Sequence, residues 1–507
     1  MLIASDIYPE PGQRKNGSGK YNTTAGIGIA IFLVCFLSSA YYYNGASWNQ
    51  NARLNPVFSY VESGTDDFRS FRMNRFIVLD GNTAPTENTG DWVRFDGDFY
   101  SNKAPGTIFL GVIAYQAIYE FEQLFNIEVG DPKLDIANAY LINLFVSALP
   151  VALCIAFFFV HMINSHVPPF LSVAISLSMF MGTALYPYST QLWGHTTAAA
   201  FIFFSLYVYL GHSRSRIFWA GLLSGFAVCT DYQAFIFTVV FGVAIVIKKR
   251  ENSLLYVAGG SIPLALFIFY HYICFDSPIA FATYYQNPEF MDQTKHFGLF
   301  GPPSLEIVWK LLFSTEKGIF IHMPVLLMSI LGYYYWIKRN PHDDVLWINL
   351  ATVLIYVLSF SSYYWWHGGA TVTARFLIPI IPLLFWALRA IPWSKQSVAV
   401  FYGLTCISVA NMSVVAAVSP LIEDYTSNPL LVTYTRFLNS ELNPFDLFIK
   451  LHKFHPDIAD FIQNTTWNVG ELMGLEGLSS VAPLILFQMV CVGGLLVLAR
   501  RTSGVSG

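Results

Sequence analysis

Residues 91–106 read DWVRFDGDFYSNKAPG, and this stretch decides how the rest of the chain is interpreted. It holds three aspartates, one arginine and one lysine, and an apolar segment of about 20 residues begins where it ends. Charges are costly beside a bilayer, so a charged cluster at the edge of an apolar segment is a candidate functional site. The stretch therefore predicts an acid/base group next to a cation that can bind a phosphate.

The composition of the full chain is typical of a membrane protein. Of its 507 residues, 54% are hydrophobic and only 12% are charged, whereas soluble domains carry about 25% charged residues. The mean hydropathy is +0.48, and apolar runs of about 20 residues recur along nearly the whole chain. The net charge of −4 gives no reason to expect nucleic acid as a partner.

Thirteen segments are candidate membrane helices. They are 24–43, 106–125, 136–160, 168–187, 195–211, 216–230, 232–247, 255–275, 318–337, 344–364, 375–391, 397–418 and 481–499. The predicted fold class is therefore an all-α polytopic membrane protein, a bundle of about 12–13 membrane helices. If both ends of the chain are cytoplasmic, the number of crossings is even. The segment least expected to cross fully is 106–125, and the pair 216–230 and 232–247 can instead form a hairpin of half-helices hinged at Asp231.

The predicted domain organisation follows from these helices and from the positive charges between them. Residues 1–23 form a cytoplasmic tail, 24–418 a membrane domain that includes the outer loop 44–105, 419–480 a second outer loop, and 481–507 the last membrane helix with its tail. Loop 44–105 alternates apolar with charged positions, which predicts short amphipathic helices along the membrane surface. Loop 419–480 is too long for a simple connection, so we expect it to be folded.

Polar residues that map to the outer ends of the helices predict one pocket on that face. They are Asp91, Asp96, Tyr100, Asn102, Lys103, His195, Asp231, His367 and Arg375. A substrate that enters from the bilayer is a lipid; Lys103 and Arg375 can hold its phosphate, and Asp91 can act as a general base. Simpler explanations exist as well: Asp96 can belong to a turn, Lys103 can anchor a helix end, and the aromatic residues can form an interfacial belt.

The sequence requires no cofactor. No spacing of histidine, cysteine and aspartate matches a structural zinc site. Clusters of aspartate can bind Mg²⁺ or Mn²⁺, and nothing else in the chain calls for a divalent cation.

Five pieces of the chain match, in order, the motifs of one known family. Residues 97–106 (GDFYSNKAPG) match G-x-x-Y-S-x-K-x-P-G, residues 192–195 (LWGH) match F/W-G-H, residues 316–324 (EKGIFIHMP) match x-x-G-L-F-x-x-x-P, residues 366–379 (WHGGATVTARFLIP) match W-x-G-G followed by R-F-L-x-P, and residues 428–430 (NPL) with 474–477 (GLEG) match parts of a late outer loop. The chain thus resembles the bacterial GT-C glycosyltransferases, a membrane superfamily that includes protein O-mannosyltransferases and the lipid A aminoarabinose transferase.

The resemblance implies a polyprenyl-phosphate-linked sugar donor and an inverting displacement on the outer face of the membrane. It implies that Asp91 is the general base, with Asp96 as the reserve choice, and that Lys103 and Arg375 hold the donor phosphate. His195 and His367 would line the pocket. The family's acidic pair directly after the first helix is missing, because residues 44–51 read NGASWNQN.

The sequence thus favours a glycosyltransferase in a bacterial cytoplasmic (inner) membrane, with its active site facing the periplasm or the outside. Its acceptor would be a cell-envelope glycan, a lipid or a protein. A transporter or flippase of a lipid-linked sugar is the alternative, but it should show internal symmetry and charges near the bilayer midplane. A structural or assembly subunit is a third possibility, and it would not need Asp91, Lys103 and Arg375 to converge.

Overall fold

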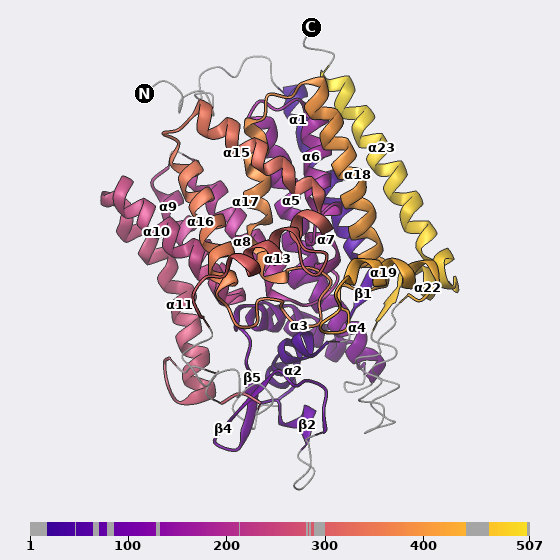
Figure 1. Ribbon diagram of the computed structural model, residues 1–507. Helices are drawn as coiled ribbons and strands as arrows, with labels where there is room; N and C mark the ends of the chain where they lie inside the picture. Colours follow the sequence, from indigo (N-terminus) through magenta and orange to yellow (C-terminus); the bar gives the residue numbers. More distant parts are fainter. Residues whose placement is uncertain are drawn as a thin grey trace.

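The computed structural model describes residues 18–45, 47–63, 70–78, 86–127, 132–211, 213–279, 282, 285–287, 300–442 and 466–503. Most of the predicted cytoplasmic tail (1–17) and part of the predicted late outer loop (443–465) lie outside the described residues. The architecture is a helical bundle with short strands at one end (Figure 1). The predicted all-α class is confirmed.

The bundle is built from long helices that alternate with shorter or broken ones. Its main helices are α1 (Ser18–Ala40), α4 (Pro132–Asn143), α5 (Leu149–Asn164), α6 (Pro169–Met181), α8 (Gly194–Tyr209), α9 (Ser215–Thr230), α10 (Phe235–Lys248), α11 (Ser253–Phe275), α15 (Leu327–Arg339), α16 (Asp344–Ser361), α17 (Ile381–Trp386), α18 (Lys395–Val418) and α23 (Ala482–Ser503). Within the described residues, six helical stretches are long and apolar enough to cross a membrane: Thr23–Ala40, Leu134–Asn164, Arg250–Phe275, Asp344–Ser361, Lys395–Val418 and Gly477–Arg501. The protein is therefore an integral membrane protein.

Proline explains why two of the predicted membrane helices are interrupted. The predicted helix 318–337 is divided into α14 (Ile319–His322), η7 (Pro324–Leu326) and α15, because Pro324 cannot continue the preceding helix. The predicted helix 375–391 becomes η8 (Arg375–Ile380), α17 and η9 (Ala387–Ala390), with prolines in the first two. The predicted hinge at Asp231 is present: α9 ends at Thr230, and η3 (Tyr232–Ala234) leads into α10.

The segment 106–125, predicted to cross incompletely, forms α3 (Gly106–Leu124). It is not among the candidate membrane spans of the described chain. It packs against α2 (Trp48–Glu62) at the lower end of the bundle in Figure 1.

The described part of the predicted first outer loop contains one α-helix, the short 3₁₀ helix η1 (Asn74–Phe76) and two pairs of short strands. Helix α2 is largely buried, and the rest of the loop pairs β2 (Ile77–Val78) with β3 (Thr86–Glu87), and β4 (Trp92–Phe95) with β5 (Asp98–Ser101). The turn between β4 and β5 is Asp96-Gly97, and both residues have positive φ (48° and 90°). Asp-Gly suits this two-residue hairpin turn, because both positions need the left-handed region. The predicted alternation of apolar and charged residues therefore belongs to short strands as well as to a helix.

An early and a late segment of the described chain form a two-stranded sheet. β1 (Tyr42–Asn44), directly after α1, pairs antiparallel with β6 (Thr466–Asn468), which precedes α22 (Val469–Leu472), η10 (Gly477–Val481) and α23. The Tyr41 hydroxyl donates a 2.6 Å hydrogen bond to the carbonyl of Ser480. Helices α1 and α23 pack together, so the last helix closes the bundle against the first (Figure 1).

Candidate active site

Two glycines bring the starts of helices α3 and α8 against the end of α9. A Cβ on Gly106 would lie 2.5 Å from the backbone carbon of Cys229, and a Cβ on Gly194 would lie 2.1 Å from the carbonyl oxygen of Thr230. No other residue permits such close backbone contact. As a result, the side chains of Lys103, His195 and the hinge residue Asp231 lie close together.

Asp91 and Lys103 form an ion pair at the base of the β4–β5 hairpin. Lys103 Nζ lies 2.9 Å from Asp91 Oδ1, and both side chains are mostly buried. The Asp91 backbone N–H donates to the Thr89 hydroxyl, which fixes the start of the strand. The strand pairing Trp92↔Ser101 sets the register that places the two charged residues on either side of the hairpin.

Opposing effects determine the ionisation of this pair. Burial alone would raise the pKa of Asp91, but the charges of Lys103 and Arg375, with hydrogen bonds from Lys103 and Asn102, hold that pKa below its usual value. Burial lowers the pKa of Lys103 to about 8, and the neighbouring charges of Arg53 and Arg375 act in the same direction. Asp91 is thus a carboxylate at neutral pH.

Arg53 is a third buried cation of the site. It lies on α2 and is 4% exposed. Its Nε donates a 3.1 Å hydrogen bond to the Thr107 hydroxyl, and its Nη1 donates a 2.8 Å bond to the carbonyl of Asn49. Burial lowers the pKa of Arg53 to about 10, while the charges of Asp231 and Asp91 raise it. No carboxylate forms a salt bridge with Arg53 in the described part of the chain, so its charge is available to a ligand.

Arg375 completes the set of cations. Its guanidinium carbon lies 4.8 Å from the centre of the Trp193 ring and 5.1 Å from that of Phe376. Stacking on aromatic rings fixes a guanidinium without satisfying its N–H donors. Arg375 Nε is buried and has no hydrogen-bond partner among the described residues. Such a donor is positioned for an anion from outside the protein.

His195, Asp231 and Gln233 form a hydrogen-bonded group next to these cations. Nδ1 of His195 bonds to the carboxylate of Asp231, and Gln233 Nε2 donates to Asp231 Oδ2 at 2.7 Å. The carboxylate thereby orients the imidazole and defines which nitrogen faces it. His195 Nε2 is buried and has no protein partner within the described residues.

The charges of this site leave one positive charge in excess. Arg53, Lys103 and Arg375 supply three positive charges, and Asp91 and Asp231 supply two negative ones. A buried excess of positive charge is costly unless an anion binds there. The arrangement can hold a phosphate, with Asp91 or His195 able to accept a proton.

The structure brings together most of the residues that the sequence singled out. Asp91, Lys103, His195, Asp231 and Arg375 lie in the cluster. Asn102 borders it, since its amide nitrogen is 3.5 Å from Asp91 Oδ1. His367 lies beside it, because the neighbouring Gly368 contacts the Arg375 side chain: a Cβ there would be 3.0 Å from Arg375 Cγ.

Two predicted residues do not join the cluster. Asp96 is exposed at the tip of the β4–β5 hairpin, where it occupies the first position of the turn. Tyr100 points into a separate apolar cluster and packs on Phe275, with ring centres 5.5 Å apart. Tyr100 lies opposite Val93 in the β4–β5 pair, and both side chains belong to this apolar cluster.

Arg53 and Lys317 are the functional candidates that the sequence reasoning missed. Arg53 is the one basic residue of α2, which is otherwise mostly neutral. A lone arginine in a helix with no other basic residue is the signal that could have drawn attention to it. Lys317 was included in a motif but given no role, although its amine is buried.

The donor atoms of the site do not fit a divalent cation. Asp91 is held by Lys103, and Asp231 is held by His195 and Gln233. Within the described residues no group of three or more histidine, cysteine, aspartate or glutamate side chains is arranged to hold a metal. The sequence requires no cofactor and leaves a role for Mg²⁺ or Mn²⁺ open, and this prediction stays untested.

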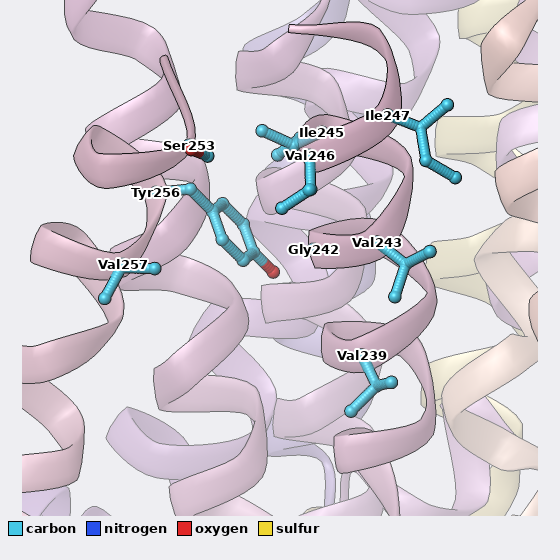
Figure 2. Close-up of a pocket in the computed structure, with 9 residues that line it drawn as sticks. All are labelled: Val239, Gly242, Val243, Ile245, Val246, Ile247, Ser253, Tyr256 and Val257. Carbon is cyan, nitrogen blue, oxygen red and sulfur yellow. The ribbon is translucent and has the colours of Figure 1, made fainter. Parts of the chain in front are cut away.

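An apolar groove lies elsewhere, between α10 and α11 (Figure 2). Its volume is about 390 Å³. It is lined by Val239, Gly242, Val243, Ile245, Val246, Ile247, Ser253, Tyr256 and Val257. The Tyr256 hydroxyl already bonds to Ser224 and to the carbonyl of Thr238. This groove therefore offers no chemistry of its own, and the charged cluster is the candidate active site.

The chain matches no family model and no curated protein sequence. Among solved structures it is similar to ArnT from Cupriavidus metallidurans bound to undecaprenyl phosphate, with 12% identity, a TM-score of 0.41, and coverage of 97% of this chain and 80% of that one. It is also similar to the apo state of the same enzyme, with 12% identity, a TM-score of 0.40, and coverage of 96% and 76%. This likeness assigns no role to any residue.

Proposed function

We propose that this protein is a membrane glycosyltransferase that moves a sugar from a polyprenyl-phosphate-linked donor to an acceptor hydroxyl on the outer face of the membrane. The observation that carries the proposal is the convergence of three buried cations, Arg53, Lys103 and Arg375, with one positive charge in excess. A structural subunit has no need for such a cluster.

The charge of the site matches the charge that develops in this reaction. A sugar linked to a polyprenyl phosphate is a phosphodiester with one negative charge. Its leaving group, the polyprenyl phosphate, is a monoester that gains a second negative charge as the bond to the sugar breaks. Preorganised cations that stabilise charge more strongly in the transition state than in the bound donor accelerate such a step.

Asp91 is the proposed general base, and the Lys103 ion pair controls its availability. In the free protein Lys103 neutralises the Asp91 carboxylate at 2.9 Å. A donor phosphate competes for the same amine, and the carboxylate is then free to take the proton of the acceptor hydroxyl. Attack from the side opposite the leaving phosphate would invert the anomeric carbon.

The His195–Asp231 pair is a positioning group in this proposal. Its imidazole lies against Phe376, with ring centres 5.8 Å apart, next to the Arg375 backbone. It lines the pocket where the donor's sugar meets the phosphate site. The proposed location is a bacterial inner membrane with this face toward the periplasm, and the acceptor is a glycan, lipid or protein of the cell envelope.

The proposal is tested with the purified full chain and undecaprenyl phosphate as a probe. The proposed site binds this monoester, so its addition should raise the melting temperature of the wild type, and Arg375→Met should remove the shift. Farnesyl alcohol, which has a prenyl chain but no phosphate, is the control ligand. Equal shifts with both ligands would contradict a phosphate site.

Transfer itself is measured in membranes with radiolabelled sugars on defined polyprenyl-phosphate donors. Label appearing in the membrane extract with wild type, and not with Asp91→Asn, supports the proposal. Phosphate binding without transfer, together with movement of the lipid-linked sugar across liposomes that contain the protein, would instead establish the transporter alternative.

A further inference from the structure

Three ring side chains from two different outer segments face one another beside Arg375. The ring centres of Trp365 and His367 are 4.8 Å apart and those of His367 and Tyr425 are 5.5 Å apart, with interplanar angles of 40° and 39°. The carboxylate of Asp424 lies next to them, with Oδ1 3.9 Å from His367 Nδ1. We call these four residues the aromatic platform.

The platform lies against the proposed phosphate site through its glycine turn. Gly368 and Gly369 both have positive φ (75° and 71°). This backbone brings His367 next to the Arg375 side chain, since a Cβ on Gly368 would be 3.0 Å from Arg375 Cγ. A ligand on the platform is therefore close to the cation that would hold the donor phosphate.

A buried lysine fixes the glycine turn. Lys317 is 5% exposed, and its Nζ donates hydrogen bonds to the carbonyls of Gly369 (3.2 Å) and Thr371, and to the Thr371 hydroxyl (3.3 Å). An ammonium group that is desolvated to hold backbone carbonyls makes a rigid anchor. This gives Lys317 a positioning role for the platform.

The second half of the platform is tied to the first by backbone hydrogen bonds. Val372 N–H donates to the carbonyl of Pro420 at 3.0 Å, and Ile422 N–H donates to that of Ala370 at 3.4 Å. Glu423 forms an ion pair with Arg436 of α19 (Pro429–Leu438). Asp424 and Tyr425 are thus presented by a braced turn.

Tyr425 is held in a conformation that exposes its ring. Its φ is +63°, which is unusual for a bulky aromatic residue. Its exposed fraction is 79%, so the strained backbone does not serve to bury the ring. Local strain that presents a side chain to solvent is a feature of ligand sites.

The Asp424 carboxylate is free to accept hydrogen bonds from a ligand. The Nδ1 of His367 already accepts a 3.1 Å hydrogen bond from Gly369 N–H, so it has no proton for Asp424. The distance of 3.9 Å is also too long for a hydrogen bond. Among the described residues no side chain or backbone group donates to this carboxylate at hydrogen-bond distance.

An exposed carboxylate between aromatic faces fits a sugar ring. The electron-rich faces of the rings attract the C–H groups of a pyranose, and the carboxylate accepts hydrogen bonds from its hydroxyls. The negative charge of Asp424 disfavours a phosphorylated ligand. It also disfavours the interior of a lipid layer, which argues against an ordinary interfacial belt.

We propose that the aromatic platform of Trp365, His367, Asp424 and Tyr425 is the acceptor subsite, and that the acceptor is a glycan presenting an uncharged or amine-bearing pyranose. The assignment of the bound sugar as the acceptor rests on the proposed function. The binding of a sugar to the platform does not depend on that function.

The first test measures sugar binding without transfer. Saturation-transfer difference NMR on the full chain in detergent uses maltotetraose, chitotetraose and chitosan tetramer as probes, with glucose 1-phosphate as the anionic comparison. Wild type is expected to bind at least one tetramer at millimolar concentration. Tyr425→Ala and Asp424→Asn should each weaken this binding tenfold or more, and Trp309→Ala, an exposed aromatic residue of α13 (Leu305–Phe313), should not.

The second test separates acceptor from donor kinetics in the transfer assay. Tyr425→Ala and Asp424→Asn should raise the acceptor KM at least tenfold and leave the donor KM within twofold. A rise in donor KM alone would place the donor's sugar on the platform and overturn the acceptor assignment. Binding of no tetramer, or equal binding by all variants, would overturn the platform itself. Sugar binding that depends on Tyr425, with no transfer by wild type, would support the platform and contradict the proposed function.

Discussion

Lys103 Nζ and Asp91 Oδ1 lie 2.9 Å apart, in the same buried cluster as Arg53 and Arg375. The ion pair neutralises both buried charges in the protein without ligand. Under the proposed function, a phosphate that binds Lys103 would release Asp91, so this one contact would couple donor binding to activation of the base.

Asp91→Asn is expected to lower transfer by roughly 10²–10⁴-fold, because an amide cannot accept the proton of the acceptor hydroxyl. Initial rates at saturating donor measure this. Asp96→Asn is the matched control: the same chemical change at the exposed hairpin tip should leave the rate within twofold. If Asp96→Asn abolished transfer and Asp91→Asn did not, the roles of the two residues would be reversed.

Arg53→Met should weaken donor binding roughly tenfold or more, since it removes a charge-assisted hydrogen bond to the phosphate. Donor KM and the binding of undecaprenyl phosphate both report this loss. Arg94→Met removes an exposed arginine of the neighbouring strand β4 and should change neither. An unchanged donor KM in Arg53→Met would remove this residue from the site.

Gly194→Ala should destabilise the protein by about 1–3 kcal/mol, because the new methyl group would overlap the Thr230 carbonyl. The melting temperature in detergent and the amount of folded protein in membranes test this. The control is Gly403→Ala in α18, where nothing lies within 4 Å of the added Cβ. There, alanine should be neutral or slightly stabilising. Equal melting temperatures for the two variants would refute the close contact of α8 with α9.

Binding of undecaprenyl phosphate should weaken as the pH rises through about 8, where Lys103 loses its proton. Lys103→Arg should move this loss to higher pH, because arginine stays protonated. A binding curve that stays flat from pH 7 to pH 10 in the wild type would exclude Lys103 as a phosphate ligand.

The free energy of unfolding should rise over the pH range in which phosphate binding weakens. The pKa of Lys103 is about 8 in the folded chain, below its usual value of 10.5. Between these pH values the unfolded chain binds more protons than the folded one, so the free energy of unfolding rises with pH. Lys317, whose pKa burial also lowers to about 8, contributes in the same way. Lys317→Met should therefore reduce the pH dependence of the melting temperature and leave the midpoint of phosphate binding unchanged.

The sequence predicted the membrane class and most of the charged cluster because those signals are local. Apolar runs mark the helices, and Asp91, Lys103 and Arg375 stand out because they interrupt an apolar chain. The sequence did not reveal Arg53, since its position in the site depends on how α2 packs against α3. The positions of Asp96 and Tyr100 also depend on the fold, since the structure places Asp96 at the exposed hairpin tip and Tyr100 in an apolar cluster with Phe275.

The number of membrane helices was harder to predict, because it depends on where each helix breaks inside an apolar segment. Hydropathy does not register where a proline ends a helix inside an apolar segment, as at Pro324. The aromatic platform could not be predicted from the sequence either. Its two halves, around residues 367 and 425, come together only through backbone hydrogen bonds between distant segments.

The pairing of β1 with β6 has a consequence for how the protein is made. The partner of Tyr42–Asn44 is Thr466–Asn468, far along the sequence. Chains are synthesised from the N-terminus, so the segment after the first helix is made long before the strand that pairs with it. A chain that terminates before residue 466 would therefore reach the membrane with an open strand edge at Tyr42–Asn44 and without helix α23, a form suited to recognition by quality-control proteases.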